Sequence, residues 1–248
     1  MNAHRFHCRD SGDLVIFGSG GFGRETAQAV LAANRSGASW RLLGYLDDDP
    51  ALRGALVDGM PVLGSRDELR HLPDAAVVVC TGRPDNYVSR MRIVGDLSLP
   101  SERYATIIHP SVALSESSAI GPGSVLLAHV VLTAAVRIAA HVAIMPHVTL
   151  THDDVIEDFA TIASGACLGG GVTIGKAAYI GAQAIIGENR KVGEYALAGM
   201  GAVVTQDIPP REVWAGVPAR RLREASIPQH DSLESAVPLG DHGIEEYR

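Results

Sequence analysis

The sequence is poor in the features that mark several classes of protein. Its three cysteines, Cys8, Cys80 and Cys167, lie far apart without metal-ligand spacing, which predicts reduced thiols and no disulfide framework. Aromatic residues make up only 5% of the chain, so the core is expected to be aliphatic. No apolar run approaches the ~20 residues of a membrane span, and residues 1–13 lack the apolar core of a signal peptide. We therefore expect a soluble cytoplasmic protein.

Basic residues are scarce relative to acidic ones, whereas glycine is abundant. The net charge of -7 argues against nucleic acid as a partner, because phosphate backbones favour basic surfaces. The 27 glycines among 248 residues exceed ordinary usage. Such an excess calls for an explanation in the backbone, where glycine permits turns and close approaches.

A six-residue repeat runs from Ile108 to Val204. Every sixth residue in this range is apolar, and each is Ile, Leu or Val except Ala198, while small or β-branched residues dominate two places earlier. A helix would repeat near 3.6 residues and an ordinary strand would alternate by two. The unbroken register predicts a parallel β-helix, in which each unit is one short strand and one corner and three units close a triangular coil. The marked aliphatic residues are expected to fill its interior.

The first part of the chain follows a different pattern. Apolar runs at 13–17, 41–46 and 75–80 predict buried strands, and helical stretches follow the first run to about residue 34 and the third from about residue 85. Alternating strands and helices predict a small parallel Rossmann-like sheet. We therefore divide the chain into an extension (1–12), a Rossmann-like domain (13–105), a β-helix domain (106–222) and a polar tail (223–248), which has no motif and a composition typical of disorder.

A glycine-rich turn follows the first strand, with the sequence GSGGFGRE at residues 18–25. Backbone N–H groups at the start of a helix bind phosphate, and acidic residues after the next strand accept hydrogen bonds from ribose or base. The predicted nucleotide-binding residues are Gly18, Gly20, Gly21, Phe22, Asp47 and Asp48. Two alternatives are a tight turn that binds nothing and a dinucleotide dehydrogenase. The second is disfavoured because a β-helix follows where a second nicotinamide-binding half would stand.

Taken together, these motifs resemble those of the sugar O-/N-acyltransferase family, which includes sialic acid O-acetyltransferases and nucleotide-aminosugar N-acetyltransferases. The resemblance covers residues 13 to about 222. The motifs that carry it are GSGGFGRE (18–25), YLDDD (45–49), HPSV (109–112), THDDVIEDF (151–159), SGACLGGGVTIG (164–175), GMGAVVTQDIP (199–209) and AGVPAR (215–220). Their joint occurrence in this order is a strong signal.

The resemblance implies a left-handed β-helix and a homotrimer that binds acetyl-CoA, or another acyl-CoA, between neighbouring columns. It also implies that the nucleotide part of the acceptor rests on the N-terminal domain and that His152 is the general base. By its position, Asp153 is predicted to orient the His152 ring and stabilise its charged form. The glycines at 169–171 are candidate oxyanion donors, and Cys167 is interpreted as a small core residue.

The acyl-CoA arm is expected to run along the column towards a basic end. The predicted cofactor-binding residues are Gly170, Gly181, Ala182, Gly199 and Arg220, with Arg221 as a second phosphate partner. His129 and His147, with His141 nearby, lack carboxylate or cysteine partners, so we interpret them as polar residues of the outer face and expect no metal.

The sequence departs from the family pattern at two positions near the base. Met145-Pro146 replaces a usual Asn-Thr pair, and Thr161 replaces a histidine that commonly follows the base by nine residues. Both Met145 and Thr161 are predicted to face the substrates. The predicted function is transfer of an acyl group from acyl-CoA to an amino or hydroxyl group of a nucleotide-linked sugar. Two alternatives are transfer to a small non-sugar acceptor and a non-catalytic trimeric scaffold that binds nucleotide sugars.

Overall fold

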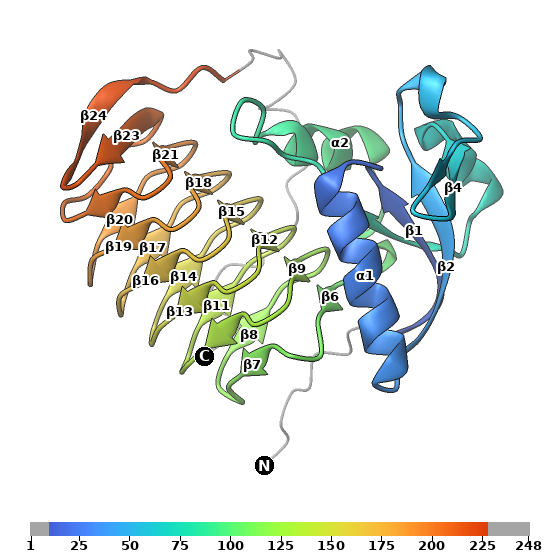
Figure 1. The fold of residues 1–248 in the computed structure, drawn as a ribbon, viewed down its shortest axis with the longest axis horizontal. Coiled ribbons are helices and arrows are strands. Elements are labelled where there is room, and N and C mark those ends of the chain that lie inside the picture. The colour runs from blue at the N-terminus through green and yellow to red at the C-terminus, as the bar shows by residue number, and fades with distance from the viewer. Residues whose placement is uncertain (1–9, 228–248) are drawn as a thin grey trace.

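The computed structural model describes residues 10–227 and shows two parts joined side by side. An α/β part of helices and a twisted sheet lies at one end of a long column of stacked coils (Figure 1). The two ends of the sequence, residues 1–9 with Cys8 and residues 228–248 of the predicted tail, lie outside the described residues. Within residues 10–227, no helix is both long and apolar enough to cross a bilayer.

The α/β part is a five-stranded sheet in the order β3-β4-β2-β1-β5. Its strands are β1 (Ser11–Phe17), β2 (Ser39–Leu46), β3 (Leu56–Val57), β4 (Met60–Gly64) and β5 (Ala76–Val79), and all pair in parallel except β3 with β4. The helices are α1 (Gly21–Arg35), α2 (Ser89–Leu97) and the 3-10 helices η1 (Pro50–Leu52), η2 (Arg66–His71) and η3 (Ser101–Arg103). The three predicted strands and the Rossmann-like sheet are confirmed.

The order of the strands places a crevice at the sheet's carboxyl edge. The chain proceeds outward from β1 through β2 to β4 and then returns to add β5 on the other side of β1. In open α/β sheets, ligands bind where this reversal separates two strand ends. The carboxyl ends of β1 and β5 lead to Gly18 and to Thr81-Gly82 respectively, so these two loops flank the crevice.

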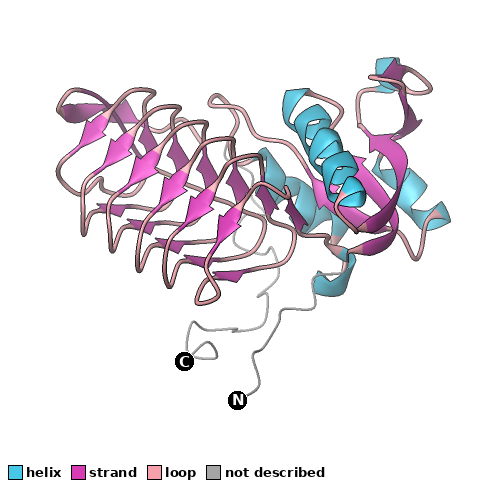
Figure 2. Ribbon diagram, turned by 60° about the horizontal axis from the view of Figure 1, so that its bottom comes forward, coloured by secondary structure: helices cyan, strands magenta, loops and turns pink. Residues whose placement is uncertain are grey.

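The column is a triangular β-helix (Figure 2), and each of its three faces is a sheet in which the strands of successive coils pair in parallel. Face A consists of β7 (Ala113–Leu114), β10 (Val131–Leu132), β13 (Thr149–Leu150), β16 (Cys167–Leu168), β19 (Ile185–Ile186) and β22 (Val203–Val204). Face B consists of β8 (Ala119–Ile120), β11 (Arg137–Ile138), β14 (Val155–Ile156), β17 (Thr173–Ile174) and β20 (Lys191–Val192). Face C consists of β6 (Ile107–Ile108), β9 (Val125–Leu126), β12 (Ala143–Ile144), β15 (Thr161–Ile162), β18 (Tyr179–Ile180) and β21 (Leu197–Ala198), followed by β23 (Glu212–Gly216) and β24 (Ala219–Glu224).

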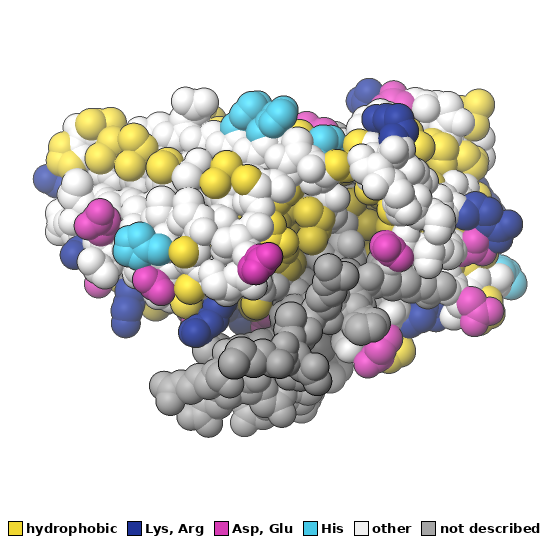
Figure 3. All heavy atoms as spheres, turned by 90° about the horizontal axis from the view of Figure 1, so that it is seen from below, with side chains coloured by type: hydrophobic (Ala, Val, Ile, Leu, Met, Phe, Trp, Pro, Cys, Tyr) yellow, Lys and Arg dark blue, Asp and Glu magenta, His cyan; other side chains and the backbone are white. Residues whose placement is uncertain are grey.

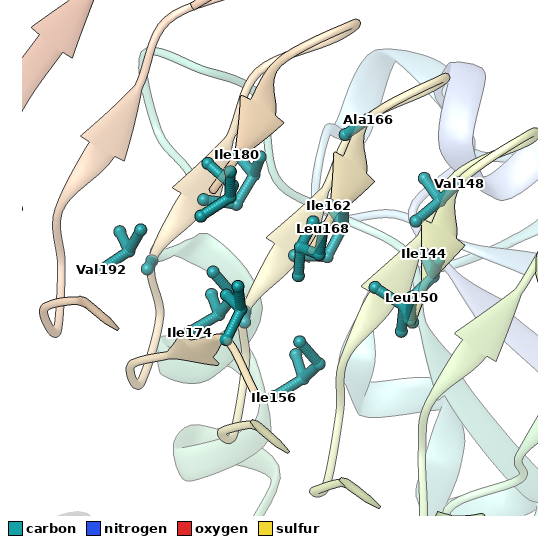
Figure 4. Close-up of a cluster of buried hydrophobic side chains, with 14 of the residues drawn as sticks. Ile144, Val148, Leu150, Ile156, Ile162, Ala166, Leu168, Ile174, Ile180 and Val192 are labelled. Atoms are coloured by element: carbon teal, nitrogen blue, oxygen red, sulfur yellow. The ribbon is translucent and has the colours of Figure 1, made fainter. Parts of the chain in front are cut away.

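The interior of the column is the predicted stack of aliphatic residues (Figure 4). Ile144, Leu150 and Ile162 are fully buried there, and each pairs in register with the equivalent residue one coil away. The repeat therefore predicted both the faces and the core. Leu114 is the exception, since it is 44% exposed. It lies on β7, the edge strand of face A, so no further coil covers it on that side.

A β-hairpin ends the column. β23 pairs in parallel with β21, and β24 turns back against β23 through a cis Val217–Pro218 bond. The hairpin covers the last coil of face C, where an open strand edge would otherwise be exposed. β24 continues to Glu224, so the ordered hairpin reaches slightly into the range expected for the tail.

Candidate active site

The glycine-rich turn combines two structural glycines with two open ones. At Gly18 a Cβ would lie 2.7 Å from the Cys80 carbonyl oxygen, and at Gly23 it would lie 1.9 Å from the Gly18 oxygen, so both allow β1, α1 and β5 to pack closely. At Gly20 and Gly21 a Cβ would meet nothing within 4 Å. These two residues therefore leave free space at the N-terminus of α1, where the backbone favours an anion.

The two acidic residues predicted to contact the nucleotide already hold partners within the chain. Asp47 accepts hydrogen bonds from the Ser19 backbone N–H (3.0 Å) and hydroxyl (2.6 Å), which fixes the glycine turn. Asp48 accepts from the Arg66 backbone N–H and guanidinium. Burial alone would raise the pKa of Asp48, but these bonds from Arg66 hold it below its ordinary value. Contact of either carboxylate with a nucleotide stays a prediction.

A pocket of about 200 Å³ lies where the α/β part meets face C. It brings together three of the predicted substrate-binding residues, Phe22, Met145 and Thr161, with Ala182 from the predicted cofactor set. Its remaining walls are Gly82, Arg90, Ala143, Ala163, Ser164 and Tyr179. Since Phe22 and Gly82 follow the ends of β1 and β5, the pocket lies at the crevice that the strand order defines.

Arg90 forms the inner wall of this pocket and joins the two parts of the molecule. The side chain extends from α2, is only 1% exposed, and donates to the carbonyl oxygens of His141 (2.7 Å), Phe159 (2.8 Å) and Ala160 (3.1 Å). It also donates to the Thr161 hydroxyl at 2.9 Å. Burial lowers the pKa of Arg90 to about 10. Within residues 10–227, no carboxylate forms an ion pair with it.

His152 and Asp153 stand on the corner between faces A and B, away from the pocket. The His152 Nδ1–H donates to Asp153 Oδ2 at 2.9 Å, and both side chains are mostly exposed. This hydrogen bond is the main reason that the pKa of His152 lies above its ordinary value. The pair has the geometry that orients an imidazole for proton transfer at Nε2.

Gly170, one coil further on, provides the seat for the His152 ring. A Cβ at Gly170 would lie 2.3 Å from His152 Nε2, which no real contact allows. The N–H groups of Gly169 and Gly171 already donate to the carbonyl oxygens of Ile186 and His152. Of the three predicted oxyanion donors, Gly170 therefore remains the candidate, and it lies against the His152 ring.

Gly170→Ala is expected to displace the His152 ring and lower kcat by about tenfold or more, because a shift of ~1 Å in a catalytic group is costly. The melting temperature should change little, since the Gly170 backbone is not in the left-handed region. Steady-state rates and thermal melts test this. Gly187→Ala is the matched control, since its Cβ would meet the Val204 carbonyl oxygen at 3.1 Å and no catalytic group.

The structure does not bring the predicted cofactor residues together at one point. At Gly181 an added Cβ would lie 2.4 Å from the Met200 backbone nitrogen, and at Gly199 it would lie 2.9 Å from Ala215 Cβ. Both glycines therefore pack tightly against the segment that follows. Ala182 lines the pocket, and Arg220 lies on β24 with its guanidinium bonded to the Ala219 carbonyl oxygen. Their cofactor role stays a prediction, as does that of the neighbouring Arg221, which pairs with Glu212.

Two sequence interpretations were wrong about burial. Cys167 is exposed, not a core residue, because it directly precedes the inward-facing Leu168 on β16 and so points outward. His141 is buried, not on the outer face, because its corner lies against the α/β part, where it packs between Tyr104 and Phe159. Burial lowers the pKa of His141 to about 3.

His129 and His147 do stack on adjacent coils, with ring centroids 4.9 Å apart. They occupy the corner between faces C and A, so they are separate from His152, and Figure 3 shows histidine side chains in distinct groups on the surface. Among residues 10–227, no three His, Cys, Asp or Glu side chains group as ligands for a metal ion.

His152 and the pocket lie on opposite edges of face A. Met145 follows β12 at one edge, and His152 follows β13 at the other. Between them the chain turns at Pro146-His147 and then runs along β13 to the next corner. His152 therefore stands on a different corner of the column from the pocket and does not line it.

A Rossmann-like domain beside a hexapeptide β-helix is an arrangement that this chain shares with transferases of the hexapeptide-repeat class. Residues 13–94 match the PglD N-terminal domain. The acetyltransferase domain of PglB from Neisseria gonorrhoeae is 30% identical and superposes with a TM-score of 0.73 over 85% of this chain and 99% of that one. The chain belongs to the sugar O-/N-acyltransferase family with a left-handed β-helix.

Two further relatives carry more specific names. UDP-N-acetylbacillosamine N-acetyltransferase of Bacillus subtilis is 31% identical over 120 residues, which are 47% of this chain and 51% of the relative. The chain thus spans about half the length of this curated relative. PerB from Caulobacter crescentus, solved in complex with CoA and GDP-perosamine, is 26% identical, with a TM-score of 0.74 over 85% of this chain and 97% of that one.

Proposed function

We propose that this chain transfers an acyl group, in the first instance acetyl, from acyl-CoA to the amino group of a nucleotide-linked aminosugar. The observation that carries the proposal is the His152–Asp153 pair, held at 2.9 Å on an exposed corner of the column. The names of the relatives support the choice of co-substrate and acceptor, since PerB binds CoA and GDP-perosamine and the B. subtilis relative is an N-acetyltransferase.

The reaction needs one base and one oxyanion donor. His152 Nε2 takes a proton from the amine as its nitrogen attacks the thioester carbonyl, while Asp153 holds the Nδ1–H and stabilises the imidazolium. We assign the Gly170 N–H as the donor to the oxyanion of the tetrahedral intermediate. Collapse of the intermediate breaks the carbon–sulfur bond, forms the amide, and returns the proton from His152 to the departing thiolate.

The acceptor is assigned to the crevice at the ends of β1 and β5. The open glycines Gly20 and Gly21 suit a diphosphate at the N-terminus of α1. The adjoining pocket then receives the sugar between Phe22 and Met145 on its apolar side and Thr161 on its polar side. Both co-substrates are cytoplasmic compounds, so we place the protein in the cytoplasm.

The test is free-thiol release from acetyl-CoA with UDP-, dTDP- and GDP-linked aminosugars as acceptors. Thiol release with an aminosugar, and none with the corresponding hydroxyl sugar, supports the proposal. Release only with small non-sugar amines would move the function to that class of acceptor. Binding of nucleotide sugars without turnover would make the chain a non-catalytic scaffold.

The rate is expected to rise with pH through the pKa of His152, because only the neutral ring accepts a proton. Since the hydrogen bond to Asp153 raises this pKa, Asp153→Asn should move the acidic limb of the kcat profile to lower pH and also lower the plateau. Profiles between about pH 5 and 9 test the expectation. An acidic limb that stays in place in the variant would contradict the assigned role of Asp153.

We also propose that the chain is a homotrimer in which His152 of one subunit serves the pocket of another. The separation of base and pocket within one chain supports this arrangement. The outward residues of face A, which lies between them, are uncharged: Ala113, Val131, Thr149, Cys167, Ile185 and Val203, of which Ile185 is 50% exposed. An uncharged and largely apolar face of this kind is suited to burial against a second copy.

Light scattering gives the mass of the assembly, and mixed oligomers test the shared site. His152→Ala removes the base, and Ser164→Trp blocks the mouth of the pocket. Each variant alone should be inactive. Oligomers formed from both should regain activity, because some interfaces pair an intact base with an intact pocket. Equal inactivity of the mixture and the separate variants would overturn the arrangement.

A further inference from the structure

The corner that carries His152 has a different hydrogen-bond pattern from the other corners of face A. Just after each strand of this face, a backbone N–H normally donates to the carbonyl oxygen one coil further on. Ser115 bonds Leu132 (3.2 Å), Thr133 bonds Leu150 (3.1 Å), and Gly169 bonds Ile186 (2.9 Å). On the next coil after Thr133 the equivalent N–H belongs to Thr151, and it donates to a side chain instead of to the next coil.

The Thr151 N–H donates to Asp154 Oδ2 at 2.8 Å, and the Thr151 hydroxyl donates instead to the Leu168 carbonyl oxygen at 3.0 Å. The side chain therefore takes over the ladder bond that the backbone makes elsewhere. Both changes flank His152, which lies between Thr151 and Asp154 in the sequence. The Asp154 carboxylate thus changes the hydrogen bonding of the corner that carries His152.

Asp154 lies inside the column, where it is fully buried. At the same place on this corner the neighbouring coils have Val136 and Val172, which are also fully buried. The second oxygen, Asp154 Oδ1, accepts from the Val172 backbone N–H at 2.8 Å. Because Val172 follows Gly170-Gly171, the carboxylate ties the coil that carries His152 to the coil that seats its ring.

We propose that Asp154 is a positioning residue that holds His152 against Gly170 in the geometry for proton transfer. This inference rests on the proposed function. A buried carboxylate in an aliphatic column is costly unless its hydrogen bonds are satisfied, and here both oxygens are. The fold alone does not need a carboxylate at this position, because Val136 and Val172 fill the equivalent position on the neighbouring coils.

Ser118 provides an internal comparison, because it occupies the same corner two coils before Asp154. The Ser118 hydroxyl accepts from the Val136 N–H at 3.1 Å, the same cross-coil bond that Asp154 makes with Val172. Ser115, the counterpart of Thr151, nevertheless keeps its ladder bond to Leu132. Serine at position 154 is therefore expected to preserve the bond between coils and to release Thr151 to the ordinary ladder, which moves His152.

The charges around the corner give a second readout. The carboxylates of Asp153, Asp154 and Glu188 each raise the pKa of His152. Burial raises the pKa of Asp154 to about 6, against the opposing effect of the two backbone N–H groups. Replacement of Asp154 by a neutral residue should thus lower the pKa of His152 and move the acidic limb of the rate profile to lower pH.

The experiment compares Asp154→Ser and Asp154→Asn with Ser118→Ala in the full-length oligomer. In both position-154 variants kcat should fall by about tenfold or more, while KM for acetyl-CoA and for the acceptor changes by less than about threefold. The His152 pKa, measured by NMR titration, should fall as well. Ser118→Ala removes a comparable cross-coil bond and should leave kcat and the His152 pKa unchanged, and thermal melts report the folding of each variant.

Folded position-154 variants with kcat within about twofold of the parent and an unchanged His152 pKa would overturn the positioning role. Equal loss of kcat in Ser118→Ala would overturn it too, because the effect would then follow from any weakened coil. Failure of the proposed function is a separate result: activity that survives in His152→Ala refutes the base itself and leaves the hydrogen bonds at Asp154 unexplained.

Discussion

Replacement of His152 by alanine is expected to lower kcat by about 10²–10⁴-fold, the contribution of a positioned general base. The imidazole is the group that Asp153 orients at 2.9 Å and that Gly170 seats. KM for both substrates should change little, because a general base stabilises the transition state and contributes little to the binding of the ground state. Steady-state kinetics with acetyl-CoA and the best nucleotide aminosugar measure the effect.

The control for this variant is His147→Ala, which removes a histidine from the neighbouring corner of the same coil. It should retain most of the activity, since His147 stacks on His129 and is assigned no part in proton transfer. Should His152→Ala keep more than about a tenth of the parent kcat, the assignment of the base is wrong. A rise in KM alone would instead make His152 a binding residue.

Arg90→Met is expected to destabilise the fold by on the order of 3 kcal/mol or more, because several buried acceptors lose their donor at once. The guanidinium bonds three carbonyl oxygens of the column corner and the Thr161 hydroxyl, while its own helix belongs to the α/β part. Methionine keeps much of the apolar stem but donates no hydrogen bond. Equilibrium denaturation, followed separately by probes in the two parts, measures the loss.

Arg41→Met serves as the comparison for this prediction. Arg41 on β2 pairs with Asp13 on the neighbouring strand β1, and the Arg41 side chain is largely exposed, so the ion pair adds little to stability. The denaturation midpoint of this variant should stay near that of the parent. Equal denaturation midpoints for Arg90→Met and Arg41→Met would show that the stability of the contact between the α/β part and the column does not depend on the buried guanidinium.

The fold was largely readable from the sequence because a β-helix is a local, repeated solution. From Ile108 to Val204 every six-residue unit carries an apolar residue at the same position, so this spacing predicts which residues form the faces and which fill the core. The exception, Leu114, shows the limit of counting, since a repeat does not say where a face of the column ends. The short antiparallel strand β3 and its partner β4 were missed, because two-residue pairing leaves no period to detect.

The candidate site was readable only where its chemistry is local in the sequence. His152 and Asp153 are adjacent, so their motif predicted the hydrogen bond between them. Asp154 was missed although it breaks the rule that small or β-branched residues occupy its place in the repeat. Arg90 carried no signal, since an arginine on an amphipathic helix is usually exposed. Its role depends on which corner α2 meets, and that is a matter of tertiary packing.

Acetyl-group transfer with a labelled donor tests the central proposal most directly. Acetyl-CoA labelled in the acetyl group is incubated with a nucleotide aminosugar and either the parent protein or His152→Ala, and the sugar is analysed by mass spectrometry and NMR. We predict labelled acetyl on the amino nitrogen with the parent protein and almost none with the variant. Unlabelled sugar with the parent protein, or equal labelling by both proteins, would contradict the proposal.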